Sequence, residues 1–180
     1  MATTLNNWTA LRLALDPRLR VIKIPGTVRT IRVNRKAAPL FAAFLADWNR
    51  EMPKRLKLAV GPVDGWFYRA SRLTSRLSNH ASGTAVDVRY DVLKADGKRH
   101  MSDTERATLK AILARYVTAD GHHVLANGYA WNHCDEMHTE LSQYWDKGNG
   151  AKRHTTPADV AEVIARLRID KNGNRRLAVR

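Results

Sequence analysis

Two short segments of the sequence gather side chains that could hold a metal ion. In the first, His80 and Asp87 flank a turn of small residues that would let the two side chains converge. The second, residues 131–140, contains further imidazoles and carboxylates together with the only cysteine. A zinc ion that hydrolyses a bond takes three protein ligands and keeps one position for water. The first segment could supply two ligands, and the second the third ligand and a general base.

The first segment also carries a family resemblance. It reads Ser-Asn-His-Ala-Ser-Gly-Thr-Ala-Val-Asp and resembles the Ser-x-His-x-x-Gly-x-Ala-x-Asp signature of the zinc D-alanyl-D-alanine carboxypeptidases and L-alanyl-D-glutamate endopeptidases. The resemblance covers residues 66–141 and implies a Hedgehog/DD-peptidase-like fold. It further implies that His80 and Asp87 bind Zn²⁺. A later acid-x-x-His element, here Asp135 to His138, would supply the base and the third ligand.

The general base has two candidates. The family acid is commonly Glu, whereas this chain has Asp135, a replacement in which it resembles phage endolysin members of the family. Glu136 is the rival. On an ideal strand Glu136 and His138 share a face and Asp135 points away, so a role for Asp135 requires a bulge or a loop. We favour Asp135 because of the family spacing.

Two further residues are predicted to contribute to substrate binding. Arg69 follows the aromatic Tyr68 shortly before the signature, and the resemblance implies that such an arginine binds substrate and stabilises developing negative charge. It could also be one of many solvated arginines in a basic chain. Ser78 lacks a visible histidine and acid pair that would make it a nucleophile, and we expect it to form hydrogen bonds around the site.

Other metal-binding residue types have less specific interpretations. Cys134 and His133 could complete a different zinc site, but a thiolate is typical of closed structural sites. The remaining histidines are unassigned, because a lone histidine is more often structural than functional: His100, His122, His123 and His154.

The hydrophobic pattern predicts an α+β fold, in one domain over residues 1–180. Strands are expected at residues 21–24, 28–33, 66–68, 84–90, 122–125 and 137–141. Helices are expected to begin near Pro39, after Ser102 with its capping partner Glu105, and after Thr156. We therefore expect a small, mainly antiparallel sheet with flanking helices. Residues 155–180 should form the last helix and a basic tail.

The net charge of the chain indicates which classes of partner it could bind. Lys and Arg number 31 against 17 Asp and Glu, a formal net charge of +14 that attracts polyanions such as nucleic acid, anionic membranes and wall polymers. No recognisable nucleic-acid motif accompanies this charge. No run of about eighteen apolar residues exists, so we expect no stable membrane insertion. Residues 1–16 lack the apolar stretch of a signal peptide.

Together these features predict a zinc-dependent peptidoglycan peptidase that acts as a monomer. A phage endolysin of the endopeptidase type is favoured, held in the host cytoplasm before its release to the cell wall. A D-alanyl-D-alanine carboxypeptidase is the alternative within the family. A zinc-stabilised cationic module that binds the wall without catalysis, and a nucleic-acid-binding protein, are the alternatives from other classes.

Overall fold

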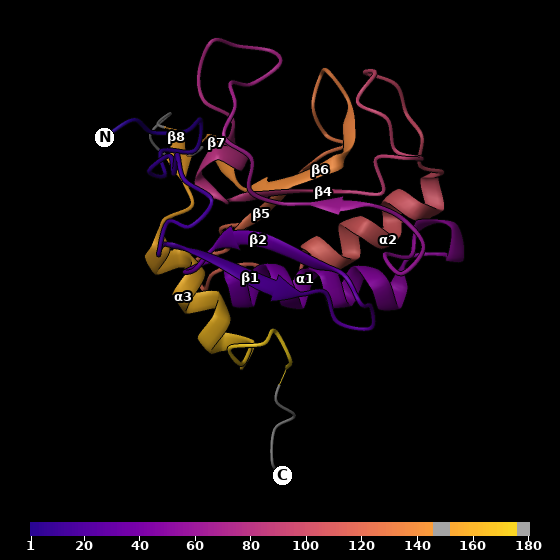
Figure 1. Cartoon of the computed structure of the whole chain (residues 1–180). Helices are drawn as coiled ribbons and strands as arrows, with labels where there is room; N and C mark the ends of the chain where they lie inside the picture. Colours follow the sequence, from indigo (N-terminus) through magenta and orange to yellow (C-terminus); the bar gives the residue numbers. More distant parts are fainter. Residues whose placement is uncertain (146–151, 176–180) are drawn as a thin grey trace.

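The computed structural model describes residues 1–145 and 152–175, and its elements confirm the α+β class (Figure 1). The α-helices of this part of the chain are α1 (Ala38–Glu51), α2 (Asp103–Leu113) and α3 (Pro157–Arg166). Its strands are β1 (Leu19–Lys23), β2 (Thr30–Asn34), β3 (Val63–Asp64), β4 (Ala85–Val88), β5 (Leu125–Gly128), β6 (Asp135–Leu141), β7 (Gln143–Trp145) and β8 (Lys152–His154). Two 3₁₀ turns, η1 (Lys54–Leu56) and η2 (Asn79–Ser82), complete the set.

A four-stranded sheet lies at the centre. Its order is β3-β4-β6-β5, and all three neighbouring pairs are antiparallel. The hairpin of β1 and β2 lies in front of α1, and β7 pairs with β8 in a second small hairpin (Figure 1). The expected hairpin before the first helix and the expected antiparallel sheet are therefore confirmed.

The helices begin where the sequence places their caps. Ser102 accepts a hydrogen bond from the backbone of Glu105, whose carboxylate bonds back to Ser102, and α2 starts there. Thr156 and Asp159 form the same reciprocal pair at the start of α3. Pro39 lies in the first turn of α1, where the missing N–H costs nothing.

The core is formed by α1 and the elements that surround it. Phe44 packs edge-on against Trp48 and Tyr116, with ring centroids 6.0 and 6.2 Å apart. These three side chains are fully buried. Burying a side chain of this size contributes about 1.5–3 kcal/mol. The same cluster includes apolar residues of β4, β5 and β6, so the sheet that carries the site rests on a packed layer.

Two strand predictions are wrong in position. Residues 66–68 do not form a strand; the adjacent β3 ends at Asp64, and the indole of Trp66 donates to the carbonyl of Leu11 at 2.9 Å. Aromatic residues favour strands, but here the ring is used to tie the N-terminal segment to the sheet. The strand expected at residues 122–125 begins only at Leu125 and runs to Gly128.

No described helix is long and apolar enough to cross a membrane. The predicted basic tail lies partly outside the described residues.

Candidate metal centre

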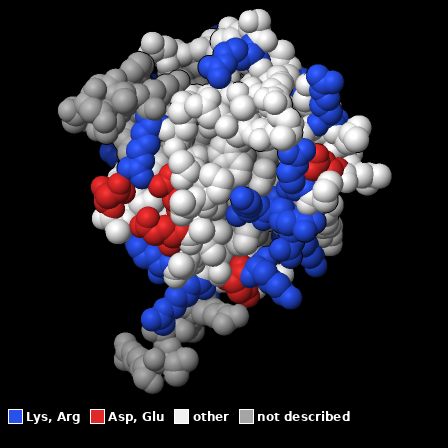
Figure 2. Space-filling model, turned by 90° about the vertical axis from the view of Figure 1, so that its left-hand side faces the viewer, with Lys and Arg blue, Asp and Glu red and all other residues white. Residues whose placement is uncertain are grey.

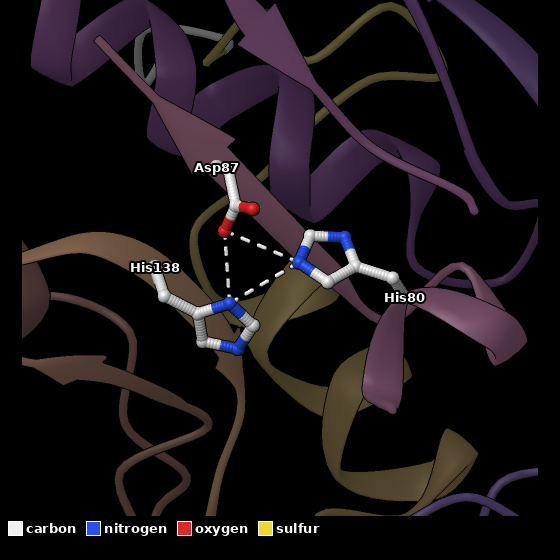
Figure 3. A group of neighbouring side chains, drawn as sticks. All are labelled: His80, Asp87 and His138. Carbon is white, nitrogen blue, oxygen red and sulfur yellow. Dashed lines mark hydrogen bonds and ion pairs between the residues drawn. The ribbon is translucent and has the colours of Figure 1, made fainter. Parts of the chain in front are cut away.

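Three side chains predicted as metal ligands meet on one face of the central sheet, above its two inner strands (Figure 3). Nε2 of His80 lies 3.1 Å from Oδ1 of Asp87 and 3.2 Å from Nδ1 of His138. Nδ1 of His138 lies 2.9 Å from the same Asp87 oxygen. All three side chains are buried. Within the described ranges this is the one group of three or more such residues whose ligand atoms could share a metal ion.

The sheet itself places two of the three residues. Asp87 on β4 and His138 on β6 are direct partners in the antiparallel register. Side chains of directly opposed residues project to the same face of a sheet, about 5 Å apart at their Cβ atoms. A residue shift in either strand would separate them, so the β4–β6 register is what brings the carboxylate to the imidazole.

The third residue, His80, is positioned by the η2 turn. The hydroxyl of Ser78 caps this turn by accepting a hydrogen bond from the backbone N–H of His80 at 3.3 Å. Gly83 ends it with a left-handed φ of 69°. A Cβ at Gly83 would lie 2.5 Å from the backbone nitrogen of Asn34, so only glycine lets the turn approach β2 so closely.

The far nitrogens of both imidazoles are already bonded. Nδ1 of His80 donates to the carbonyl of Gly65 at 2.6 Å, and Nε2 of His138 donates to Oε2 of Glu140 at 2.9 Å. Asn79 donates to the same Glu140 oxygen at 2.6 Å. These bonds fix the tautomers, because the nitrogen that donates carries the proton. His80 Nε2 and His138 Nδ1 therefore point towards Asp87 and are the nitrogens that would bind a metal ion.

The electrostatics of the cluster favour a cation. Burial alone lowers the pKa of His138, but its hydrogen bonds to Asp87 and Glu140 outweigh burial and raise the pKa to about 10. Burial alone raises the pKa of Asp87, but the two imidazoles hold it well below its ordinary value. The cluster therefore stabilises a positive charge at the place that the three ligand atoms surround.

The donor set fits zinc. With bonds of roughly 2.0–2.1 Å to nitrogen and oxygen, two ligand atoms of a tetrahedral zinc site lie roughly 3.3 Å apart. The three ligand atoms here are 2.9 to 3.2 Å apart. Two histidines and one carboxylate leave the fourth position of a tetrahedron open, which is the pattern of catalytic rather than structural zinc.

Asp135 faces the same site because β6 is bulged. Asn127 pairs with Thr139, but the next residue on β5, Gly128, pairs with Asp135. Glu136, Met137 and His138 therefore have no partner on β5. The bulge breaks the strict alternation of side chains and turns Asp135 towards a cavity of about 80 Å³ that His138 also lines. The irregularity that an assignment of Asp135 required from the sequence is present.

Glu136 points the other way. Its carboxylate is fully buried and forms an ion pair with Arg106 at 2.5 Å. It also accepts hydrogen bonds from the backbone N–H groups of His100 and Met101. All of its oxygens are used to join β6 to the start of α2, so this arrangement disfavours Glu136 as the base.

Two residues of β5 support the bulge. The side-chain amide of Asn127 donates to the carbonyl of Glu136 at 3.0 Å and to the hydroxyl of Thr139 at 2.9 Å. It thereby replaces ladder hydrogen bonds that the extra residues interrupt. A Cβ at Gly128 would lie 2.3 Å from the carbonyl oxygen of Asp135, so a side chain there would displace Asp135.

The environment of Asp135 suits proton transfer. One carboxylate oxygen, Oδ1, is buried without a hydrogen-bond partner among the described residues. Burial raises the pKa of this carboxyl; the charge of Asp87 acts in the same direction, whereas His138 and Arg72 oppose it. A carboxylate with a raised pKa and a free oxygen can accept a proton and release it again.

Residues 72–141 match the family model of D-alanyl-D-alanine carboxypeptidase. The match spans 70 of the 180 residues and contains His80, Asp87, Asp135 and His138. It indicates a peptidase of the kind that acts on peptidoglycan. No curated protein and no solved structure gives a significant match to the chain. The Hedgehog-like aspect of the fold therefore stays a prediction.

Two arginines stand beside the cluster. Arg69, predicted from the sequence, and Arg72, which sequence reasoning missed, line both the small cavity and a larger one of about 550 Å³. Arg69 donates to the carbonyl of Ala70 at 3.4 Å, which leaves most of its donors available. The larger cavity also contains Trp66, Tyr90 and Lys94. The cluster thus lies between two hollows with guanidinium groups at their junction.

The remaining predictions have different outcomes. Ser78 is buried, caps the turn under His80 and lines the small cavity, as a residue that supports the site would do. Cys134 is buried while His133 is exposed, and neither belongs to a metal-binding group within the described residues. His100 contacts Asp96 and His122 contacts Thr155, away from the cluster.

Three contributors were missed from the sequence. Glu140 lies two residues after His138 on a strand, and this spacing alone could have placed it on the same face. Trp131, whose ring centroid lies 5.3 Å from that of His138, and Arg72 reach the site from loops. Their positions depend on the tertiary path of those loops, for which the sequence carries no signal.

Proposed function

We propose that this protein is a zinc-dependent peptidase that hydrolyses peptide bonds of bacterial peptidoglycan. The observation that carries the proposal is the buried group of His80, Asp87 and His138, with Asp135 beside it in one cavity. The match of residues 72–141 to a D-alanyl-D-alanine carboxypeptidase model supports both the reaction and the polymer.

The site residues divide the chemistry among them. His80, Asp87 and His138 would hold zinc, which would supply a Lewis acid for the scissile carbonyl and make a water molecule more acidic. Asp135 accepts a proton from the attacking water and returns it to the departing amine. Arg69, with Arg72 beside it, pairs with a substrate carboxylate or with the developing oxyanion. Ser78 keeps the turn under His80 in place.

We further propose that the bond lies within the wall peptides, as in a phage endolysin. The aspartate at the position of the base resembles such enzymes. Cavities open on both sides of the cluster, so a peptide chain has room to continue past it. An enzyme of this kind accumulates in the host cytoplasm and then reaches the wall. The printed description of the family favours the second candidate, a carboxypeptidase that removes a terminal D-alanine.

Digestion of purified peptidoglycan separates these candidates. An endopeptidase clears the suspension and releases new amino termini, which mass analysis of the products assigns to one bond. Free D-alanine as the sole product, without clearing, would establish the carboxypeptidase. Chelation should abolish either activity, and added zinc should restore it, because the water nucleophile depends on the metal. Full activity in a preparation shown by elemental analysis to lack metal would contradict the proposal.

A wall-binding module without catalysis is distinguished by one variant. Asp135→Asn removes the proposed base but none of the three ligands. A binding module would retain all its measurable properties, whereas a peptidase would lose turnover and retain wall binding.

A further inference from the structure

A third cavity, of about 510 Å³, lies apart from the candidate metal centre. It shares no lining residue with the two cavities beside the cluster. Its walls come from the N-terminal segment, the open end of the β1–β2 hairpin, and the chain between β8 and α3: Asn6, Asn7, Trp8, Thr9, Leu11, Pro17, Arg18, Asn34, Arg35, Lys36, His154, Thr155, Thr156 and Pro157. Figure 2 looks onto this side of the molecule, where Lys and Arg side chains gather beside a pale, hollowed surface.

The charge of this cavity is positive and uncompensated. None of its lining residues is acidic. Arg18 is neutralised by Asp16, whose carboxylate it contacts at 2.7 Å. Arg35 and Lys36 are exposed, and their side chains have no hydrogen-bond or ion-pair partner among the described residues. Two free cations at the edge of a hollow attract an anion more strongly than scattered surface lysines would.

The walls between these charges are mostly apolar and rigid. Trp8, Leu11, Pro17 and Pro157 supply hydrophobic surface. The indole of Trp8 is held by a hydrogen bond to the carbonyl of Thr155 at 2.8 Å. Asn7, which adopts a left-handed φ of 65°, exposes a side-chain amide beside it. A ligand that matches these features carries a carboxylate, small apolar groups and peptide-type hydrogen-bonding groups.

The cavity adjoins the back of the turn that carries His80. The backbone N–H of Asn6 donates to Asn79 at 2.9 Å, and the amide of Asn34 donates to the carbonyl of Ser82 at 3.0 Å. The two sites are therefore fixed relative to each other through η2. One polymer could occupy both, and a second contact on the same polymer raises its effective concentration at the first.

We propose that this cavity binds a carboxylate-bearing peptide of the cell wall, separate from the peptide that is cleaved. The inference rests on the proposed function for the identity of the polymer. Arg35 and Lys36 pair with free carboxylates of the wall peptide, and the apolar walls receive its alanine methyl groups. The cavity thus anchors the enzyme on a neighbouring peptide while hydrolysis proceeds at the cluster.

The test uses the full chain with Asp135→Asn, so that binding is measured without turnover. The probe is a soluble disaccharide tetrapeptide prepared from peptidoglycan. Its binding should shift the indole N–H signal of Trp8 in NMR spectra, identified by its loss in Trp8→Phe. Arg35→Ala with Lys36→Ala should weaken the affinity reported by this signal at least about tenfold, since each cation forms a charge-assisted hydrogen bond.

The matched control removes the same charges from the other end of the same hairpin. Lys23 and Arg29 are both exposed and line none of the three cavities described above. Lys23→Ala with Arg29→Ala should leave the Trp8 response within about twofold. Equal weakening by both double variants would show a general charge effect and overturn the proposal. So would a probe that shifts only signals around His80 and Asp135.

Two further arms separate the inference from the proposed function. In the first arm, inorganic phosphate is titrated alone. If the Trp8 signal responds to phosphate but not to the disaccharide tetrapeptide, the assignment to a wall peptide is overturned. In the otherwise unaltered chain, Arg35→Ala with Lys36→Ala should slow hydrolysis of intact walls but leave the cleavage of a short soluble peptide unchanged. A protein that never hydrolyses either substrate contradicts the proposed function, yet the Trp8 measurement still decides the inference.

Discussion

The candidate metal cluster and the loop that carries the arginines are built in opposite ways. His80, Asp87 and His138 are 2%, 8% and 8% exposed, and each belongs to the central sheet or to a turn capped against it. Arg72 and Leu73 are exposed at the tip of the loop of residues 66–77, which rises above the sheet at the top of Figure 1. This loop is closed by few bonds, among them the one from Ser71 to the carbonyl of Arg76.

The difference separates two tasks. Ligand atoms must keep their positions within fractions of an ångström, and a paired sheet provides that precision. A group that recognises substrate can sit on a loop and adjust to the peptide. We therefore expect that substitutions in the cluster abolish metal binding, whereas each substitution in the loop changes substrate affinity by a modest amount.

The largest effect is expected from loss of a ligand. His80→Ala or His138→Ala should eliminate measurable activity and lower zinc content to below one tenth per chain, because two remaining ligands cannot hold the ion against chelation by buffer. Elemental analysis after dialysis measures the content. His123→Ala, at an exposed histidine outside the cluster, is the control and should retain full zinc. Retention of zinc in both ligand variants would mean that the cluster is not the metal site.

The next largest effect distinguishes the roles of the adjacent residues Asp135 and Glu136. Asp135→Asn should lower kcat by about a hundredfold or more, as expected for a general base, with zinc content and unfolding midpoint unchanged. Glu136→Gln should instead destabilise the fold by about 3 kcal/mol, because it breaks the ion pair between a fully buried carboxyl group and the part-buried Arg106 guanidinium. Rates and denaturant curves measured on both variants give the comparison. The reverse outcome would assign the base to Glu136.

Glu140→Gln tests the bonds behind the ligands. The carboxylate of Glu140 accepts from His138 and Asn79, so its loss weakens the orientation and basicity of the imidazole. Zinc affinity should fall by about 10- to 100-fold. Competition with a chromogenic chelator measures it. Glu162→Gln, on the distant α3, is the matched control and should not change the affinity.

Asn127→Ala tests whether the bulge in β6 orients Asp135. Removal of its amide leaves the carbonyl of Glu136 without that donor, at a cost of about 1–3 kcal/mol. Because the ligands on β4 and η2 keep their own supports, zinc content should stay above half, while kcat falls about tenfold as Asp135 loses its orientation. A drop in zinc content as large as that of His138→Ala would show that the bulge supports the metal rather than the base.

The smallest effect belongs to the loop. Arg72→Ala should raise KM about three- to tenfold for an anionic peptide, with zinc content and stability unchanged, since a partly solvated charge pair contributes about 1 kcal/mol. Arg76→Ala, on the same loop but outside the larger cavity, gives the matched comparison. If Arg72→Ala lowers kcat and leaves KM unaltered, the guanidinium acts on the transition state instead.

Much of the site could be predicted because the residue types and their spacing along the chain are enough to indicate metal ligands. His80 and Asp87 flank a small-residue turn, and a zinc site restricts the third ligand to a few residue types. Strand alternation, combined with the family spacing, even required the irregularity that β6 contains. Caps at Ser102 and Thr156 gave two helix starts, because capping is a local interaction.

Other parts depended on contacts between segments far apart in the chain. Residues 66–68 have strand propensity, yet Trp66 instead bonds to Leu11, 55 positions away in sequence. Arg72 is one arginine among many, and only the path of its loop brings it to Asp135. The third cavity, beside Trp8, combines three segments, so no single stretch of sequence could predict it.

The bulge also sets which parts of the chain can change in length. The three residues between Asp135 and Thr139 have no partner on β5, so deleting Glu136 or Met137 would leave the ladder of Thr139 to Leu141 intact but would rotate Asp135 away from the cluster. The loop of residues 129–134 has no ladder to preserve, so residues can be inserted at its exposed positions 132–133, provided that Trp131 keeps its contact with His138. Insertions should therefore be tolerated before Asp135 and excluded after it, although both positions belong to one hairpin.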